Sequence, residues 1–334
     1  MITIREVARA AGVSVATASR ALNDSVLVTA ETRARVCDAA SQLAYSPHGA
    51  ARSLITSRTQ TIGVLLPDLY GEFFSEFIRG IDQAAHREGF HCLVAGARHR
   101  GPLLEIALRS MRGRVDGLLL MCPEFTNALS GRALPVRFPV ILLNCPPSAA
   151  ECDSLAIASY EGAYAMGTHL AGLGHRRIAI IKGAPGNFDA AERLRGYRAA
   201  LRDAGLPPSP ELEAPGDFAE GSGYATVPAL LALADPPTAI FAANDAMAIG
   251  ALSALRDAGR RVPEDIALGG FDDIPMARYM TPALTTVHVD IAGLGERAVT
   301  RLLGAMRYPA EREPLRETLP ATLIVRRSCG ARSR

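Results

Sequence analysis

The sequence predicts an all-α helix-turn-helix unit followed by an α/β body, in which two doubly wound parallel-sheet subdomains enclose a ligand cleft. Three observations lead to this prediction. Apolar residues recur at helical spacing near the N-terminus, and from Thr61 onward short apolar runs alternate with helical segments. The chain has 334 residues, of which 49% are hydrophobic, so it can bury the cores of two or three domains.

The first predicted helix begins after Thr3, which is a suitable N-cap. Its apolar positions share one helical face: Ile4, Val7, Ala8 and Ala11. Gly12 ends this helix and permits a tight turn. A second helix, VATASRALN, follows the turn, and a third begins near Thr29. Two short helices joined by a glycine turn and braced by a third helix form a helix-turn-helix unit.

The outer face of the second helix carries small and polar side chains suited to DNA. Val15 and Ala16 can approach thymine methyl groups in a major groove, and Arg20 can reach a guanine or a phosphate. Thr17 and Ser19 supply hydroxyls for phosphate contacts. A three-helix module with a solvated polar face is the alternative that this pattern leaves open.

Strands and helices of the body alternate in two series. TIGVLLPD, HCLVAG, VDGLLLMC and PVILLN read as strands of the first series, and RIAIIKG, TAIFAAND and DIALGGFDD as strands of the second. Helical segments of 10–15 residues between such strands imply parallel sheets with right-handed crossovers. Ligands of such sheets bind at the carboxyl ends of the strands.

Polar and aromatic side chains gather just after these apolar runs. The candidates are Asp68, Phe73, Phe74, Asn144, Asn187, Asp189, Arg193, Asn244, Asp245, Asp272 and Asp273. Amides, carboxylates, an arginine and aromatic rings are the mixture that a small polar effector needs in a concave site. Four of them have a stated structural alternative: a core position for one of the two phenylalanines, a helix N-cap for Asp245, a turn cap for Asp273 and a surface position for Arg193.

Composition and motifs exclude several classes of protein. Residues 1–60 hold seven arginines and four acidic residues, and this excess of positive charge suits an anionic partner. The N-terminus lacks the apolar core of a signal peptide, and no apolar run is long enough to cross a membrane. The six cysteines show no metal-ligand spacing, and catalytic and phosphate-binding motifs are absent. We therefore expect a cytoplasmic protein that is not an enzyme and has no cofactor or metal.

The segment TIREVARAAGVSVATASRALN closely resembles the N-terminal signature of the lactose/galactose-repressor (LacI/GalR) family. The resemblance continues through VTAETRARVCDAASQLAYSPHGAARSL, and LGHRRIAII, ERLRGYRAAL, ANDAMAIGAL and RVPEDIALGGFDD match family motifs in order. It covers nearly the whole chain and in places approaches the purine-responsive members. It implies a body of periplasmic-binding-protein type in a transcriptional repressor.

The resemblance also implies domain limits. It predicts a helix-turn-helix domain at 1–46, a hinge helix or linker at 47–58, an effector-binding and dimerisation domain at 59–330 and a tail at 331–334. Within the body, the N-subdomain is expected at about 61–157 and 290–317, and the C-subdomain at about 158–289 and 318–328.

Site residues follow from the same resemblance. It implies DNA contacts by Val15, Ala16, Thr17, Ser19, Arg20 and Asn23 in the head and by Ala51, Arg52 and Leu54 in the hinge, with Leu54 as a minor-groove wedge. It implies effector contacts by Phe73, Phe74, Asn144, Asn187, Asp189, Arg193, Phe218, Asn244 and Asp272. No residue is implied to be catalytic.

Departures from the family bear on the effector. LAIASYEG lacks a pocket aspartate that many relatives carry, and Asn144 with Cys145 stands where pentose binders carry Asp-Arg. Asn187 and Asp189 stand where purine-responsive members carry Arg and Thr. A sugar or sugar derivative is therefore favoured over a purine as the effector.

The resemblance implies a homodimer whose two heads read a pseudo-palindromic operator in double-stranded DNA. An effector that closes the cleft would rotate one subdomain against the other and change the operator affinity. The residues do not distinguish an inducer from a corepressor. A purine-type or other corepressor-dependent repressor is the alternative, and a sugar-binding protein without a regulatory role is the alternative from another class.

Overall fold

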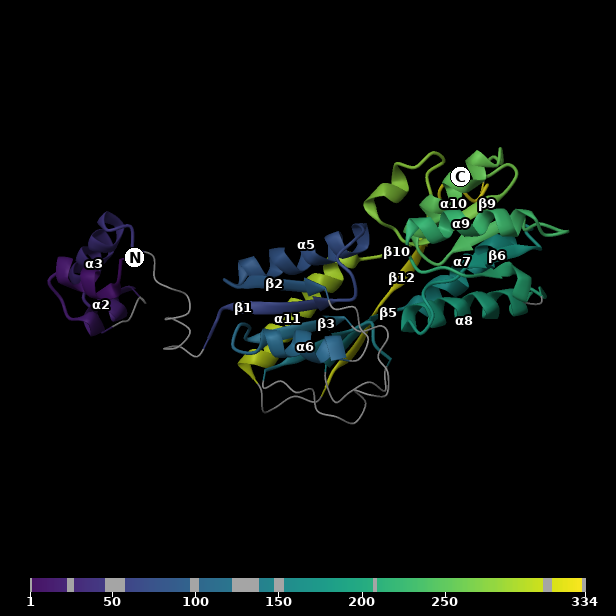
Figure 1. Ribbon diagram of the computed structural model, residues 1–334. Coiled ribbons are helices and arrows are strands. Elements are labelled where there is room, and N and C mark those ends of the chain that lie inside the picture. The colour runs from purple at the N-terminus through teal and green to yellow at the C-terminus, as the bar shows by residue number, and fades with distance from the viewer. Residues whose placement is uncertain are drawn as a thin grey trace. The chain divides into compact units, whose positions relative to one another are not determined.

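The computed structural model describes residues 2–22, 27–45, 58–96, 102–121, 138–146, 153–206, 209–308 and 314–331 (Figure 1). The chain divides into two compact units, a head of residues 1–59 and a body of residues 60–334. Each unit is described by itself below.

The head contains three helices: α1 (Ile4–Ala10), α2 (Val15–Leu22) and α3 (Ala30–Gln42). The backbone N–H of Thr3 donates to the Glu6 carboxylate at 2.7 Å, and this hydrogen bond caps the N-terminus of α1. Gly12 has a φ of 65°, so the turn between α1 and α2 needs a residue without a side chain. Thr29 caps α3 by accepting the N–H of Thr32.

The core of the head is built from small side chains. Val7 and Ala8 of α1, Ala18 of α2, and Val36 and Ala40 of α3 are buried together. Because alanine and valine are small, the three helices approach closely and expose the remaining face of α2. The predicted helix-turn-helix arrangement is therefore present.

The first sheet of the body has six strands in the order β11-β5-β4-β3-β1-β2, and all its pairings are parallel. Its strands are β1 (Thr61–Leu66), β2 (His91–Gly96), β3 (Gly117–Met121), β4 (Val140–Leu143), β5 (Asp153–Ile157) and β11 (Arg316–Leu319). Its helices are α5 (Glu72–Arg87), α6 (Pro102–Met111) and α11 (Ile291–Arg307).

Both faces of this sheet are covered, which explains why its strands are apolar without alternation. Val64 of β1 belongs to the cluster that contains Phe77 of α5, whereas the next residue, Leu65, packs with Leu108 of α6. Successive side chains of a strand point to opposite faces, so one apolar run serves both layers.

The second sheet also has six strands, in the order β12-β10-β9-β8-β6-β7. Its strands are β6 (Ile178–Ile181), β7 (Glu213–Ala214), β8 (Ala239–Ala242), β9 (Ala267–Asp272), β10 (Thr285–Val289) and β12 (Ala321–Ile324). The helices of this half are α7 (Ser159–Gly172), α8 (Phe188–Asp203), α9 (Glu220–Leu231) and α10 (Asp245–Asp257), with short 3-10 turns η1 (Pro210–Leu212) and η2 (Pro275–Arg278).

One strand departs from the predicted parallel arrangement. β12 pairs antiparallel with β10, whereas the other pairings of the second sheet are parallel. The chain passes from β11 to β12 through Pro320 alone, and no crossover helix intervenes to restore the parallel direction. Since β11 ends at Leu319, the first sheet also extends slightly beyond residue 317, the boundary expected from the sequence.

Three connections join the two sheets, and each consists of one residue between regular elements. Ala158 separates β5 from α7, Asp290 separates β10 from α11, and Pro320 separates β11 from β12. Short connections of this kind suit a hinge, because a few terminal residues can absorb the change in backbone angles.

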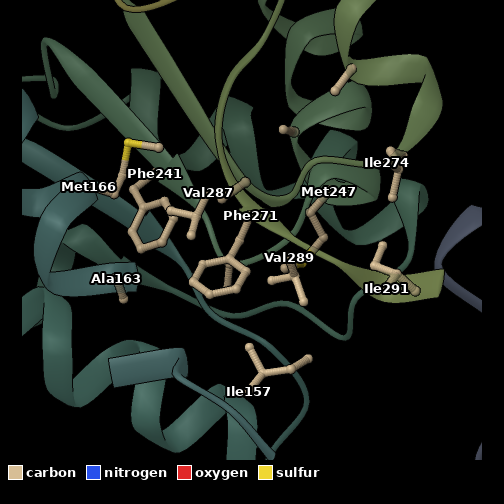
Figure 2. Close-up of a cluster of buried hydrophobic side chains, with 14 of the residues drawn as sticks. Ile157, Ala163, Met166, Phe241, Met247, Phe271, Ile274, Val287, Val289 and Ile291 are labelled. Atoms are coloured by element: carbon tan, nitrogen blue, oxygen red, sulfur yellow. The ribbon is translucent and has the colours of Figure 1, made fainter. Parts of the chain in front are cut away.

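The largest apolar cluster of the body includes residues of both sheets. Figure 2 shows Phe271 of β9 among Phe241, Val287 and Val289. Phe271 directly precedes Asp272, so this packing fixes the end of β9 where charged residues begin. No helix in the described part of the chain has the length and apolar character needed to cross a membrane.

Candidate functional site

The exposed face of α2 carries the residues predicted to read DNA. Val15 is 43% exposed, and Ala16 and Arg20 are also exposed. Ala18, which lies between them along the helix, and Ala21, which follows Arg20, are buried in the head. The helical period thus separates a packed face from a face with small side chains and one cation, which a major groove can accept.

The two hydroxyl residues of α2 are partly buried. The hydroxyls of Thr17 and Ser14 lie 2.9 Å apart, and the Ser14 hydroxyl also accepts the backbone N–H of Thr17 at 3.1 Å. Ser14 therefore caps α2, and Thr17 is held at the first turn. The remaining predicted DNA contacts, Asn23, Ala51, Arg52 and Leu54, lie outside the described residues.

A buried arginine forms the centre of a charged network in the body. Arg193 of α8 is 4% exposed, and its Nη2 donates to Asp272 Oδ1 at 3.0 Å. Its Nη1 donates to the Ala243 carbonyl oxygen, and its Nε lies 3.5 Å from Ser159 Oγ. All three guanidinium nitrogens therefore already have partners. The surface position that the sequence left open for Arg193 is excluded.

Aromatic rings lie close to this guanidinium. Arg193 Cζ lies 3.7 Å from the centroid of the Phe271 ring and 5.8 Å from that of Phe218. Gly183 makes room for Phe218, since a Cβ at that position would lie 2.1 Å from the ring. The network is therefore held by ring packing as well as by hydrogen bonds.

Three buried carboxylates accompany the single arginine. Asp189 accepts a hydrogen bond from Ser159 at 3.0 Å, so Ser159 links it to Arg193. Asp245 is 0% exposed and accepts from the Thr286 hydroxyl and the Ile274 backbone N–H.

Burial dominates the proton affinity of these three groups. It raises the pKa of Asp272 to about 6, although Arg193 acts in the opposite direction. Burial also raises the pKa of Asp189, and the attraction of Arg193 and the bond from Ser159 offset this only in part. The pKa of Asp245 is raised well above its ordinary value, first by burial and then by the charge of Asp272.

Two predicted effector residues are helix caps in this structure. Asn187 Oδ1 accepts the Ala190 N–H at the start of α8. Asn244 Oδ1 accepts the Met247 N–H at the start of α10, and its Nδ2 donates to the Phe218 carbonyl. The N-cap role weighed for Asp245 was therefore assigned one residue too late, because Asn244 fills it.

Asp273, for which a turn cap was considered, instead contacts the side chains of Arg326 and His288. Its carboxylate lies 2.6 Å from Arg326 Nη2 and 3.0 Å from His288 Nδ1. These contacts tie the residue after Asp272 to β10 and to the segment after β12. They hold the loop in place without using Asp272 itself.

Phe73, Phe74 and Asn144 are the predicted effector residues that belong to the half of the body built on the first sheet. Phe73 and Phe74 of α5 pack edge to face with centroids 5.4 Å apart, and both are partly buried. Among the described residues, no hydrogen bond, ion pair or ring contact joins them or Asn144 to Arg193. Glu72 makes a nearby link, since its carboxylate accepts the N–H of Met276 in η2 at 2.9 Å.

Backbone strain concentrates on predicted effector residues. Asn144, Phe218 and Asp272 have φ values of 51°, 74° and 104°, and Asp273 has 54°. Residues other than glycine rarely adopt positive φ, and such conformations persist where the surroundings enforce them, often at binding sites. Asn144 is 3% exposed, and none of the described residues supplies a hydrogen-bond partner for its Oδ1.

Sequence reasoning missed Ser159 and Phe271 and did not assign Asp245 to the network. Ser159 bridges two charged groups, and Phe271 stacks on the guanidinium. The only available signal for Phe271 was its place immediately before Asp272. Ser159 gave no signal, because a serine after a strand is most often a helix cap.

Other features of the body do not compete with this site. A surface hollow of about 420 Å³ is lined by residues that include Leu252, Arg260 and Pro282, and it shares no residue with the arginine network. Within the residues that the structure describes, no group of three or more His, Cys, Asp or Glu side chains is placed to hold a metal ion.

Two family models match the chain. Residues 3–48 match the model described as bacterial regulatory proteins, lacI family. Residues 168–329 match a periplasmic binding protein-like domain. The two matches correspond to the three-helix head and to most of the second half of the body.

The chain is also similar to whole proteins. It is 35% identical to the HTH-type transcriptional repressor PurR of Pasteurella multocida (strain Pm70), over 99% of this chain and 100% of that protein. A lac repressor dimer bound to operator and the anti-inducer ONPF matches with a TM-score of 0.89 and 30% identity, over 99% of each chain. A complex of the transcriptional regulator CelR with cellobiose matches with a TM-score of 0.71 and 31% identity, over 98% of this chain and 100% of that chain.

Proposed function

Since the chain belongs to the lacI family of bacterial regulatory proteins and is a DNA-binding transcriptional repressor, we propose that a sugar or sugar derivative binds at the Arg193 network and sets the operator affinity of the head. The main observation behind the proposal is that backbone strain, burial and charge meet at one residue, Asp272. Asp272 is buried, has a φ of 104° and pairs with a buried arginine. Such an arrangement costs stability, so a role in binding explains its presence.

Hydrogen-bonding capacity favours a sugar. Sugar hydroxyls donate to carboxylates, and Asp189 and Asp272 both stand in the network. Phe218 offers a ring to the apolar face of a sugar, as would Phe73 and Phe74 of α5. The CelR structure, whose ligand is cellobiose, shows that a protein of this fold accommodates a sugar.

The identity to PurR repressors favours a second candidate, a corepressor-dependent repressor of the purine type. A purine base presents ring nitrogens and a carbonyl that need donors. Three of the five guanidinium N–H groups of Arg193 are engaged, and one side-chain N–H of Asn244 already bonds to Phe218, so few donors remain for a base. The sugar is therefore the first candidate.

The head supplies sequence recognition in this proposal. Val15, Ala16 and Arg20 contact base edges, and Thr17 and Ser19 contact the DNA backbone. Asn23 extends the same face, and Ala51, Arg52 and Leu54 act from the hinge in the minor groove. A homodimer places two heads on two half-sites, as two-fold symmetry requires. The protein acts in the cytoplasm and carries out no reaction.

Effector binding would act through the three single-residue connections. A ligand that contacts both sheets favours one relative orientation of the subdomains, and only a difference in affinity between the two orientations can shift the equilibrium. The proposed subdomains meet at Ala158, Asp290 and Pro320. Rotation there would change the spacing of the two heads.

The experiment compares wild type with Asp272→Ala on an operator selected from random duplexes. Fluorescence anisotropy gives the operator affinity with and without a low-molecular-weight bacterial extract. We expect the extract to change the affinity of wild type only, while Asp272→Ala binds the operator normally. Loss of operator binding by the variant itself would count against the proposed site.

A further inference from the structure

A hydrogen bond joins the two halves of the body at the first turn of α5. The Glu72 carboxylate accepts the backbone N–H of Met276 in η2 at 2.9 Å, across 204 residues of sequence. α5 belongs to the half built on the first sheet, and η2 belongs to the half built on the second. Among the hydrogen bonds and ion pairs between described residues, this is the one that joins the halves away from the connections at Ala158, Asp290 and Pro320.

The start of η2 needs an acceptor that its own residues do not supply. Ile274, the N-cap residue, has an apolar side chain, and Pro275 at the first position has no N–H to donate. Met276 therefore carries the first backbone N–H of this turn, and the first N–H groups of a helix have no acceptor within it. Glu72 takes the place of an N-cap side chain from the other half of the body.

The segment that leads to Met276 is fixed to the second half. Residues 272–274 are held there by three partners, namely Arg193, Arg326 and Asp245. Because these contacts hold the segment to the second half, a rotation of the two halves moves Met276 relative to α5. Such a rotation therefore changes the hydrogen bond to Glu72.

Glu72 is fixed to the first half in the same way, because α5 is packed tightly there. Phe77 of α5 is fully buried in the core. Gly80 allows α5 to approach α11 closely, since a Cβ at this position would overlap the carbonyl oxygen of Ala292. The two groups of the hydrogen bond thus belong to two firmly packed parts, and the bond resists their relative rotation.

We propose that Glu72 and η2 form a clasp, the hydrogen bond from the Met276 N–H to the Glu72 carboxylate, which stabilises the orientation of the halves seen here and thereby sets the operator affinity of the head when no effector is bound. A carboxylate accepts a stronger hydrogen bond than a neutral oxygen does. The inference goes beyond the proposed effector and shares with it only the rotation at the three connections.

The test measures the operator affinity of the full chain without extract, by fluorescence anisotropy on the selected operator. Glu72→Met removes the acceptor oxygens and keeps a long, helix-forming side chain, whereas Glu72→Gln keeps an acceptor oxygen and removes the charge. We expect Glu72→Met to change the dissociation constant by about threefold to tenfold and Glu72→Gln to stay closer to wild type. Glu161→Met, the same change in the first turn of α7, is the matched control and should bind operator as wild type does.

Amide exchange of the wild type gives the direction of this change. Hydrogen–deuterium exchange, read by mass spectrometry, follows the peptide that contains Met276 with and without operator. If operator favours the clasped orientation, it should slow exchange of this peptide, and Glu72→Met should bind operator more weakly. If operator favours the other orientation, both effects should reverse, because the clasp and the operator act on the same equilibrium.

Three results would overturn the inference. The first is an unchanged operator affinity of Glu72→Met. The second is an equal effect of Glu72→Gln, which would assign the change to the charge at the start of α5. The third is a disagreement in sign between amide exchange and affinity.

The extract experiment keeps the proposed function separate from the clasp. If the extract changes the operator affinity of wild type while Glu72→Met alone binds as wild type does, only the clasp fails. If Glu72→Met changes the affinity in the direction given by amide exchange and the extract has no effect, the clasp stands and the proposed effector control fails.

Discussion

The DNA face of α2 and the Arg193 network of the body differ in how their residues are arranged. On α2, Val15, Ala16 and Arg20 follow one another within a single short helix and face outward. In the body, Arg193 and Asp272 are 79 residues apart in sequence and meet in the interior. The first surface depends on local helical geometry, whereas the second exists only when β9 and α8 have packed together.

This comparison predicts that substitutions in the network will change stability and that substitutions on the exposed face of α2 will change only DNA binding. The largest effect is expected for Arg193→Ala, which leaves Asp272 buried without its partner. We expect a loss of about 3–5 kcal/mol in the free energy of unfolding, measured by urea denaturation. The neighbouring Arg195→Ala, whose side chain is 59% exposed, should cost less than about 1 kcal/mol.

A loss below about 1 kcal/mol for Arg193→Ala would contradict the comparison. It would mean that the interior of the site is solvated enough to leave Asp272 without a counter-charge at little cost. The distinction between a local surface and a packed network would then no longer hold.

The next effect is a dependence of stability on pH. The folded pKa of Asp272, about 6, lies above its ordinary value of 3.8, so the folded state binds this proton more tightly than the unfolded state. The stabilisation of the folded state by this proton is therefore fully present below about pH 4 and is lost as the pH rises to about 6. Relative to Asp272→Asn, wild type should lose about 2–3 kcal/mol across this interval, measured by urea denaturation at each pH.

Asp265 is expected to show the opposite dependence of stability on pH. Hydrogen bonds from Arg261 lower the pKa of Asp265, so its contribution is present at neutral pH and disappears on acidification. Asp265→Asn should therefore change the pH profile in the opposite direction. Profiles of the same sign for both variants would contradict the assignment of burial as the cause at Asp272.

On the DNA face, Arg20→Ala should leave the stability of the head unchanged, because the side chain is exposed. If Arg20 reads a guanine, specific operator binding should weaken by about 1–3 kcal/mol, while binding to random duplex changes little. Anisotropy titrations of both duplexes measure this difference. An equal loss on both duplexes would assign Arg20 to a phosphate instead.

The smallest effect is expected at Asn187, where the sequence predicts effector binding and the structure shows a helix cap. Asn187→Ala should cost about 0.5–2 kcal/mol of stability, and Asn187→Asp, which keeps a capping oxygen, should restore most of it. Thermal unfolding measures the stability, and the change in operator affinity on adding the low-molecular-weight bacterial extract measures the effector response. Loss of response in the stable Asn187→Asp variant would show that the amide also contacts effector.

The fold was largely predictable, because local patterns determine its elements. The spacing of Val7 and Ala8 identifies α1, and the apolar run at Thr61–Leu66 identifies β1. The antiparallel direction of β12 was not predictable, because it follows from a one-residue connection at Pro320 that leaves no periodic signal.

The candidate site was predictable only in part. Asp272 and Arg193 were found because parallel strands bring their carboxyl ends to one edge. The hydrogen bond that places Ser159 between Asp189 and Arg193 depends on the packing of α7 against α8, and sequence spacing does not reveal it. Sequence also could not separate the capping role of Asn244 from a binding role, since both use the same side-chain oxygen.

The most direct test of the account is the affinity of the full chain for its selected operator, titrated with and without the low-molecular-weight bacterial extract. If the site in the body controls the head, the extract should change the dissociation constant by about fivefold or more, the lower end of typical coupling between two sites. A dissociation constant that stays the same at saturating amounts of the extract would contradict effector control.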